Sequence, residues 1–363
     1  MNNEKLGNKE ATCLIIMLIV NNIVFSAQKI LLNSSSSLLN SIYISLIAIG
    51  ITFIVCLLFK KFSSYDILDI SKFLGGKFLY YTVGILFFVY FLFTSAILLR
   101  KIADSLQIIY YSVTSVVFII IPFLIASSIA ANFGENGISR AGLIITPIAI
   151  ATVILIFFGN IKIFDYSNIY PILGNGIKDT FFYGISNLFA FYGLTYIFFL
   201  PPTLKEPQQF KKITLTACII SGIFLIFSIA NIVFLFNNGV SNDTVFPLYI
   251  AVRYIEFGLF FQRLDSFFLL IWILSFSYFF GIMIKILANI TKKLINLEDD
   301  KTPILPIALG IFGTSIIPFN SSALNFIQDN VLKIAFFAIL GISFIILILA
   351  NLKKRWIIWK EDY

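Results

Sequence analysis

The sequence contains ten long apolar runs separated by short polar or charged connections, and this feature limits the possible folds most strongly. Several runs approach the ~20 residues that a helix needs to cross the hydrocarbon core of a bilayer. A strand of a membrane barrel would alternate apolar and polar residues, and these runs do not. The runs lie at residues 11–32, 38–59, 78–99, 116–133, 143–159, 181–200, 213–236, 258–284, 304–319 and 334–350. We therefore predict an all-α polytopic membrane protein with ten transmembrane helices.

Composition and charge agree with this class of protein. Hydrophobic residues make up 59% of the chain and charged residues 12%, whereas soluble domains carry about 45–50% and 25%. The net charge of +8 does not indicate nucleic-acid binding, because the basic residues are spread over the connections. Most Lys and Arg residues fall on one side if both termini are cytoplasmic. An N-in, C-in integral membrane protein is therefore expected, embedded in the lipid bilayer and without a nucleic-acid partner.

The first and sixth runs are interrupted by polar and small residues near mid-depth. These are Asn21, Asn22 and Ser26 in the first run, and Gly184, Ser186, Asn187, Tyr192 and Gly193 in the sixth. In a 5+5 inverted repeat, helices one and six correspond, cross in opposite directions and are broken around the binding site. We predict this fold within a single domain, 1–363, with repeats at about 10–160 and 178–351. Two alternatives stay open: the Asn amides bind neighbouring helices, and the glycines only allow close packing.

The residue types needed for catalysis are missing. The chain has no His, no pair of carboxylates at membrane depth and no metal-ligand spacing. Cys13, Cys56 and Cys218 lie in apolar runs without a CxxC motif, so packing is the better interpretation of them. We expect no enzyme activity, no cofactor and no metal. A small zwitterion could bind between two broken helices, with its carboxylate at half-helix N-termini and its ammonium on freed carbonyl groups.

Arg263 and Asp265 stand at the start of the eighth run. A core of ~20 residues ending at Lys285 would leave both at the outer interface. A longer, tilted helix would bury them and make Asp265 a candidate proton site. We favour the first depth, in which the two residues form a structural or gating rim at the outer mouth.

Three stretches resemble the permease-like B subunits of the nutrient germinant receptors of bacterial endospores, a branch of the amino acid, polyamine and organocation transporter superfamily. They are NIYPILGNGI, PPTLKEPQQFKK and FPLYIAVRYIEFGLFFQRLDSFFLLIWILS. The third is the most specific. In it Pro247, Arg253, the triplet from Arg263 to Asp265, and Trp272 occupy the places of the family pattern.

This resemblance implies the ten-helix inverted-repeat fold and a small nutrient ligand, usually an amino acid. It implies that helices three and eight line the pocket, which adds Thr94 and Trp272 to the candidate ligand-binding residues. It also implies a complex with a larger membrane subunit and a lipoprotein subunit in the spore inner membrane. The sequence is thus interpreted as a germinant-sensing subunit that triggers germination. The alternative is an ion-coupled amino-acid permease.

Overall fold

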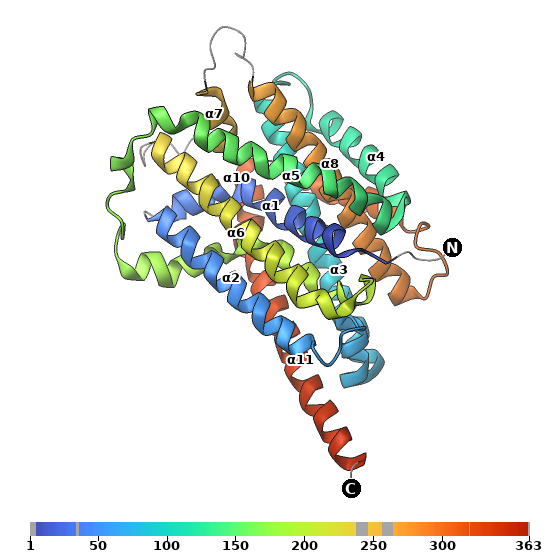
Figure 1. Ribbon diagram of the computed structural model, residues 1–363. Helices are drawn as coiled ribbons and strands as arrows, with labels where there is room; N and C mark the ends of the chain where they lie inside the picture. Colours follow the sequence, from blue (N-terminus) through green and yellow to red (C-terminus); the bar gives the residue numbers. More distant parts are fainter. Residues whose placement is uncertain (1–4, 34–35, 237–245, 256–263, 319, 362–363) are drawn as a thin grey trace.

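The computed structural model is built from helices along nearly its whole length (Figure 1). It describes residues 5–33, 36–236, 246–255, 264–318 and 320–361. The α-helices are α1 (Asn8–Asn33), α2 (Ser37–Phe59), α3 (Ile67–Ile109), α4 (Val116–Asn132), α5 (Gly134–Asn160), α6 (Phe210–Leu235), α7 (Pro247–Arg253), α8 (Leu264–Ile295), α9 (Ile304–Ile316), α10 (Ser321–Phe326) and α11 (Lys333–Glu361). Tighter 3-10 turns form η1 (Ile161–Ile163), η2 (Tyr166–Ile169), η4 (Gly184–Phe198), η5 (Pro201–Thr203) and η6 (Pro207–Gln209), and wider π turns form η3 (Lys178–Tyr183) and η7 (Ile327–Leu332).

Eight helical segments of the described chain are long and apolar enough to cross a membrane. They are Asn8–Ala27, Ser37–Phe59, Ile67–Ile109, Gly134–Ile163, Lys178–Phe198, Pro207–Leu235, Leu264–Ile295 and Ser322–Lys353. The remaining two predicted spans correspond to α4 and α9, which are apolar but only 17 and 13 residues long. The helical membrane architecture is therefore confirmed, while the count of ten spans stays a prediction.

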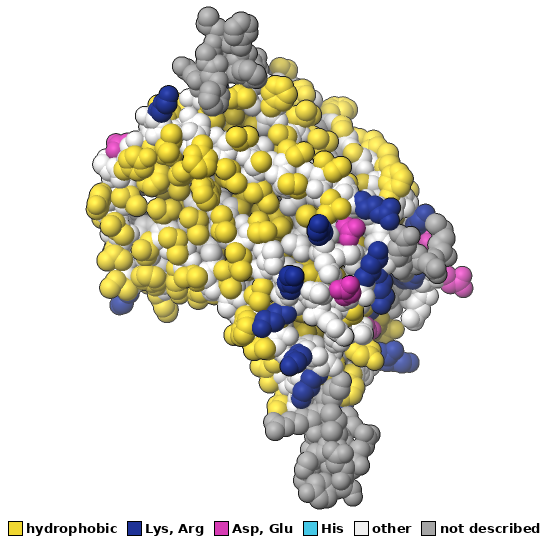
Figure 2. All heavy atoms as spheres, in the orientation of Figure 1, with side chains coloured by type: hydrophobic (Ala, Val, Ile, Leu, Met, Phe, Trp, Pro, Cys, Tyr) yellow, Lys and Arg dark blue, Asp and Glu magenta, His cyan; other side chains and the backbone are white. Residues whose placement is uncertain are grey.

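Helix α1 forms the centre of the bundle, enclosed by α5, α6, η4 and α8. Of its most apolar stretch, 83% is buried inside the protein, against 33% for the stretch in α5 and 39% for that in α2. Figure 2 shows the complementary surface, where hydrophobic side chains cover a broad face and Lys and Arg gather on the right and lower right, the side on which α1 begins in Figure 1. We call this the basic end. Asn21, Asn22 and Ser26 of α1 are buried and are thus turned toward protein and away from lipid.

The sixth span departs from regular α-helix along its entire length. It begins with the π turns of η3 and continues through the 3-10 turns of η4, where Phe191 has non-helical torsion angles of φ −95° and ψ 24°. At a rise of ~2.0 Å per residue, a 3-10 segment of this length covers about 30 Å. The predicted break is therefore found here. Helix α1, in contrast, is continuous, and Asn21 donates to the carbonyl of Met17 one turn back on the same helix, at 2.8 Å.

At the basic end, an ion-pair cluster joins the start of α3 to the end of α8. Asp66 caps α3 by accepting from the Asp69 amide at 3.0 Å. Lys293 lies 2.6 Å from the Asp66 carboxylate and 3.1 Å from that of Asp69. Burial raises the pKa of Asp66 to about 6, although the nearby Lys293 ammonium opposes the shift. The cluster therefore holds a carboxyl group that titrates near neutral pH.

A second contact at this end, which we call the N-terminal clasp, ties the residues before α1 to the chain that follows η4. The Leu6 amide donates to the Thr203 carbonyl at 2.8 Å, and the Lys205 amide donates to the Leu6 carbonyl at 2.9 Å. Leu6 and Leu204 form an isolated parallel bridge and are almost fully buried. The chain just before α1 and the chain just after η4 are thus held together.

Candidate functional site

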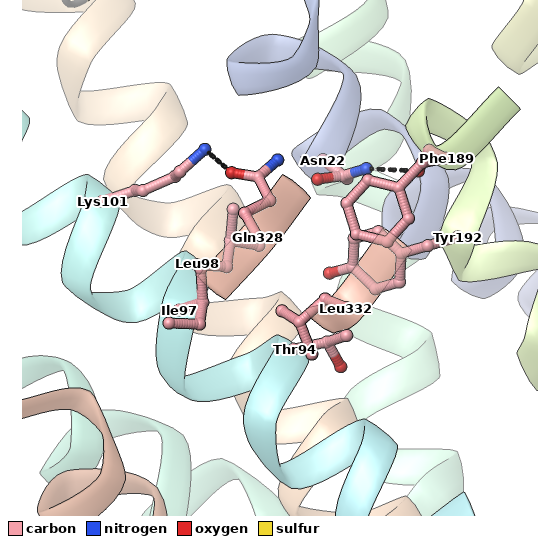
Figure 3. Close-up of a pocket in the computed structure, with 9 residues that line it drawn as sticks. All are labelled: Asn22, Thr94, Ile97, Leu98, Lys101, Phe189, Tyr192, Gln328 and Leu332. Carbon is pink, nitrogen blue, oxygen red and sulfur yellow. Dashed lines mark hydrogen bonds between the residues drawn. The ribbon is translucent and has the colours of Figure 1, made fainter. Parts of the chain in front are cut away.

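A small pocket lies where α1, α3, η4 and η7 meet (Figure 3). Its lining consists of Asn22, Thr94, Ile97, Leu98, Lys101, Phe189, Tyr192, Gln328 and Leu332. The free space is about 10 Å³, close to the ~10–15 Å³ that one water molecule requires. A larger ligand can therefore enter only if the surrounding helices move apart.

Helix α3 contributes one face to the pocket. Thr94, Ile97, Leu98 and Lys101 follow the spacing of three, four and seven residues that places side chains on one side of a helix. At ~1.5 Å per residue, Lys101 stands about 10 Å along the helix from Thr94. The Lys101 ammonium donates a hydrogen bond to the side-chain oxygen of Gln328, which reaches it from η7 (Figure 3).

Helix α1 and η4 contribute the opposite wall. The Asn22 amide group donates to the carbonyl oxygens of Phe189 and Ala190, at 3.1 Å each. These carbonyls immediately precede Phe191, whose torsion angles are not helical. The side chain of Asn22 therefore forms hydrogen bonds with backbone groups that the irregular helix leaves without partners. The Tyr192 ring stacks on Phe189 with centroids 5.7 Å apart. Its hydroxyl is buried, has no hydrogen-bond partner among the described atoms, and points into the pocket (Figure 3).

Asn22, Thr94 and Tyr192 are thus the predicted site residues that the structure brings together. The other predicted residues of the first and eighth helices do not line the pocket. Asn21 accepts from the Ser275 hydroxyl at 2.9 Å, which joins α1 to α8. Ser26 is buried, and Trp272 is fully buried among Phe224, Phe268 and Phe276. A ligand-binding role for these residues stays a prediction.

The remaining residues predicted in helix six contact neighbouring helices. Asn187 donates to the Asn40 side-chain oxygen at 2.9 Å, and Gly184 lies against the same Asn40. Ser186 accepts from Lys333 at 3.3 Å. Gly193 lies directly on the backbone of α1, where a Cβ atom would not fit. In this structure these residues make contacts between helices, as the alternative prediction for the asparagines and glycines describes.

Asp265 lies at the opposite end of the bundle from the basic end, beside α7. Its carboxylate oxygen accepts from the Tyr249 hydroxyl at 3.0 Å and from the Tyr110 hydroxyl at 3.5 Å. Asp265 therefore joins α7, α8 and the end of α3. Arg263 lies outside the described residues.

Sequence reasoning missed Lys101 and Gln328. Lys101 lies just past the apolar run 78–99, and Gln328 lies between the runs 304–319 and 334–350. Gln328 is 4% exposed and reaches the pocket because η7 continues the turn of α10 into α11. The seven-residue spacing between Thr94 and Lys101 was the available signal, since both belong to one helical face.

The model of the spore permease family, described as spore germination protein, matches residues 5–324. The chain belongs to this spore germination protein family. The identification made from sequence motifs is therefore confirmed. The chain is 25% identical over 324 residues to spore germination protein A2 of Bacillus subtilis (strain 168), covering 86% of this chain and 87% of that one. It is 24% identical over 309 residues to spore germination protein YndE of the same organism, covering 83% of each chain.

Among solved structures, this spore permease is similar to MHP1, a nucleobase-cation-symport-1 family transporter in a closed conformation with bromovinylhydantoin bound. The TM-score is 0.66 with 14% sequence identity, covering 94% of this chain and 78% of that chain. At this identity the likeness establishes the fold, which is that of the inverted-repeat transporters predicted from the sequence. Family and fold are those of permeases and transporters, which are not enzymes.

Proposed function

We propose that the protein is the germinant-sensing membrane subunit of a spore nutrient receptor and that it binds a small molecule, an amino acid, in the pocket between α1, α3, η4 and η7. The observation that carries the proposal is a small pocket in a spore permease in which a cation, two amides and two hydroxyls meet three aliphatic side chains and one phenyl ring. Such mixed lining suits a small ligand with charged ends and a short apolar part.

The small free volume supports a sensing role. A ligand larger than water has to separate the α3 face from the α1 and η4 wall, so binding and a change in helix packing are coupled. A ligand shifts a conformational equilibrium by as much as it prefers one state over the other. The separated state would be the signal that partner subunits detect.

The proposal includes the surroundings of the protein. The partners are the larger membrane subunit and the lipoprotein subunit of a germinant receptor, and the location is the spore inner membrane. Both termini lie inside, since the Lys and Arg residues of the basic end would then be cytoplasmic, where membrane proteins carry most of their positive charge. The family resemblance and the charge distribution support these points.

A germination assay tests the proposal. Spores lacking this chain are exposed to a panel of single amino acids, and germination is followed by loss of optical density. We expect the response to at least one amino acid to disappear and to return on complementation with the wild-type chain. An unchanged response to every amino acid that triggers wild-type spores would reject the sensing role.

The second candidate, an ion-coupled amino-acid permease, is favoured by the fold likeness to a cation symporter. Uptake of a labelled amino acid into vesicles containing this chain alone separates the two functions. Robust uptake driven by a proton or sodium gradient would favour the permease. Binding without gradient-driven uptake would favour the sensor.

A further inference from the structure

We propose that the hydroxyl group of Tyr192 selects the side chain of the ligand. The pocket then binds an amino acid with a neutral hydrogen-bonding side chain, a hydroxyl or a carboxamide, in preference to the apolar amino acid of the same shape. The inference rests on the proposed function and specifies the chemical class of ligand for the same site.

The hydroxyl group of Tyr192 is buried without a hydrogen-bond partner. The residue is 2% exposed, no described atom forms a hydrogen bond with its oxygen, and the group points into the pocket (Figure 3). A buried polar group that stays unpaired costs about 1–3 kcal/mol. Because the free space is about 10 Å³, a ligand that enters leaves little room for water beside the hydroxyl. The ligand itself therefore has to supply the partner.

The ring of Tyr192 is held in the orientation that directs its hydroxyl at the pocket. It stacks on the Phe189 ring with a centroid distance of 5.7 Å and an angle of 26° between the ring planes. Phe189 in turn packs edge-on against Phe336 of α11, at 5.7 Å. The next residue, Gly193, packs on the α1 backbone at Leu18. The ring therefore cannot turn its hydroxyl toward another partner without losing these contacts.

Thr94 has the second hydroxyl group of the described lining, but the proton of that group is already used. It donates to the carbonyl oxygens of Tyr90 and Phe91 on its own helix, at 2.8 and 3.1 Å. Among the nine described lining residues, Tyr192 is therefore the one whose hydroxyl proton remains available for a ligand.

Two amide side chains of the lining suit the groups that all amino acids share. The nitrogen of Asn22 donates to η4, which turns its oxygen toward Gln328 (Figure 3). The oxygen of Gln328 accepts from Lys101, which leaves the nitrogen of this amide as a donor. The Asn22 oxygen can accept from the ammonium group of a ligand, and the Gln328 nitrogen can donate to its carboxylate. Tyr192 is then the group that meets the side chain.

An apolar side chain would fill the space but leave the Tyr192 hydroxyl unpaired. Sites that form a hydrogen bond with their ligand discriminate strongly against an analogue that lacks the bonding group, whereas apolar pockets discriminate weakly between ligands of equal shape. A charged side chain would have to lose its hydration opposite a neutral hydroxyl, which costs more than burying a neutral group. Neutral polar side chains, such as those of threonine, serine and asparagine, therefore suit the pocket best.

The test measures equilibrium binding to the full-length protein in lipid nanodiscs. The probes are L-threonine with L-valine, L-serine with L-alanine, and L-asparagine with L-leucine, pairs that are similar in shape and differ in hydrogen bonding. The variants are Tyr192→Phe and, as a matched control, Tyr196→Phe. Tyr196 also belongs to η4, is 2% exposed and has a hydroxyl without a partner among the described residues, but it does not line the pocket.

We expect wild-type protein to bind at least one polar amino acid about 10- to 100-fold more tightly than its apolar counterpart. Tyr192→Phe should remove this preference, and Tyr196→Phe should keep it. The thermal midpoint of ligand-free Tyr192→Phe should equal or exceed that of wild type, because the hydroxyl that is removed has no partner. Loss of the preference then reports on the ligand and not on the fold.

The inference is overturned if wild-type protein binds both members of every pair equally or prefers the apolar ones. These results leave the amino-acid function intact and need no variant to fold. The inference also fails if Tyr192→Phe keeps the preference or if Tyr196→Phe loses it to the same extent. Wild-type protein that binds none of the six amino acids would instead reject the proposed amino-acid function, and the inference with it.

Discussion

Gly193 of η4 packs directly on the Leu18 peptide group of α1, and a Cβ atom at this position would overlap the Leu18 carbonyl. The two central helices therefore touch backbone to backbone, just beyond the pocket residue Tyr192. Gly193→Ala should force the helices apart and reduce the free energy of unfolding by about 1–3 kcal/mol. The thermal midpoint of the purified protein in detergent measures this effect. Gly341→Ala is the control, because nothing lies within 4 Å of a Cβ there; equal midpoints for both variants would contradict the close contact.

Asn22 and Asn231 are two buried asparagines that differ in whether their side chains form hydrogen bonds. Asn22 satisfies two carbonyls of η4, whereas neither side-chain polar atom of Asn231 has a partner among the described residues. Asn22→Leu should lower the thermal midpoint and abolish ligand response, since each stranded buried carbonyl costs about 1–3 kcal/mol. Asn231→Leu should leave the midpoint unchanged or raise it. A larger loss at Asn231 than at Asn22 would count against the bonding described for η4.

Tyr249 connects α7 to Asp265 through its hydroxyl at 3.0 Å. Tyr249→Phe keeps the ring but removes a hydrogen bond to a carboxylate, which contributes about 1.5–3 kcal/mol in a buried place. The amides of α7 should then exchange with deuterium about tenfold faster or more. Tyr254→Phe is the control, because Tyr254 is exposed. If exchange in α7 is the same in both variants, Asp265 does not hold this helix.

Lys293 should contribute more to stability at pH 8 than at pH 5. The folded chain raises the pKa of Asp66 to about 6, above its ordinary value of about 3.9. The folded state thus binds this proton more tightly, and the stabilisation that results is fully present below pH 4 and lost as the pH rises through 6. The Lys293 ammonium offsets the loss only once Asp66 is ionised. The thermal midpoint of Lys293→Met should therefore fall further below wild type at pH 8 than at pH 5.

The exposed Lys60 at the same end provides the comparison for this pH series. Lys60→Met should follow the wild-type midpoint at both pH values, because a single exposed charge contributes little to stability. A gap between Lys293→Met and wild type that narrowed toward pH 8 would show that Asp66 is not the titrating group.

The long apolar spans and three of the nine described lining residues of the pocket were predictable, mainly because polar groups are costly in an apolar run. Asn22 and Tyr192 were found because polar side chains stand out in a membrane helix, and Thr94 because the family resemblance places helix three at the pocket. Lys101 was missed because its depth depends on α3, which continues to Ile109, well past the apolar run that ends at 99. Neighbouring helices, and not the local sequence, bury that extension. The continuity of α1 could not be predicted either. Asn21 and Asn22 indicate that hydrogen-bond partners are present, but the sequence does not show on which helix those partners lie.

The central position of α1 has a consequence for biosynthesis. It is made before its partners, because Asn22 bonds a carbonyl 167 residues further along the chain and the N-terminal clasp cannot close before Lys205 exists. At ~5–20 residues per second, translation leaves α1 without these partners for roughly 10 to 30 s. During that interval its two asparagines must be accommodated by the insertion machinery or by water at the membrane surface. Helix α1 thus leaves the ribosome well before its native surroundings exist.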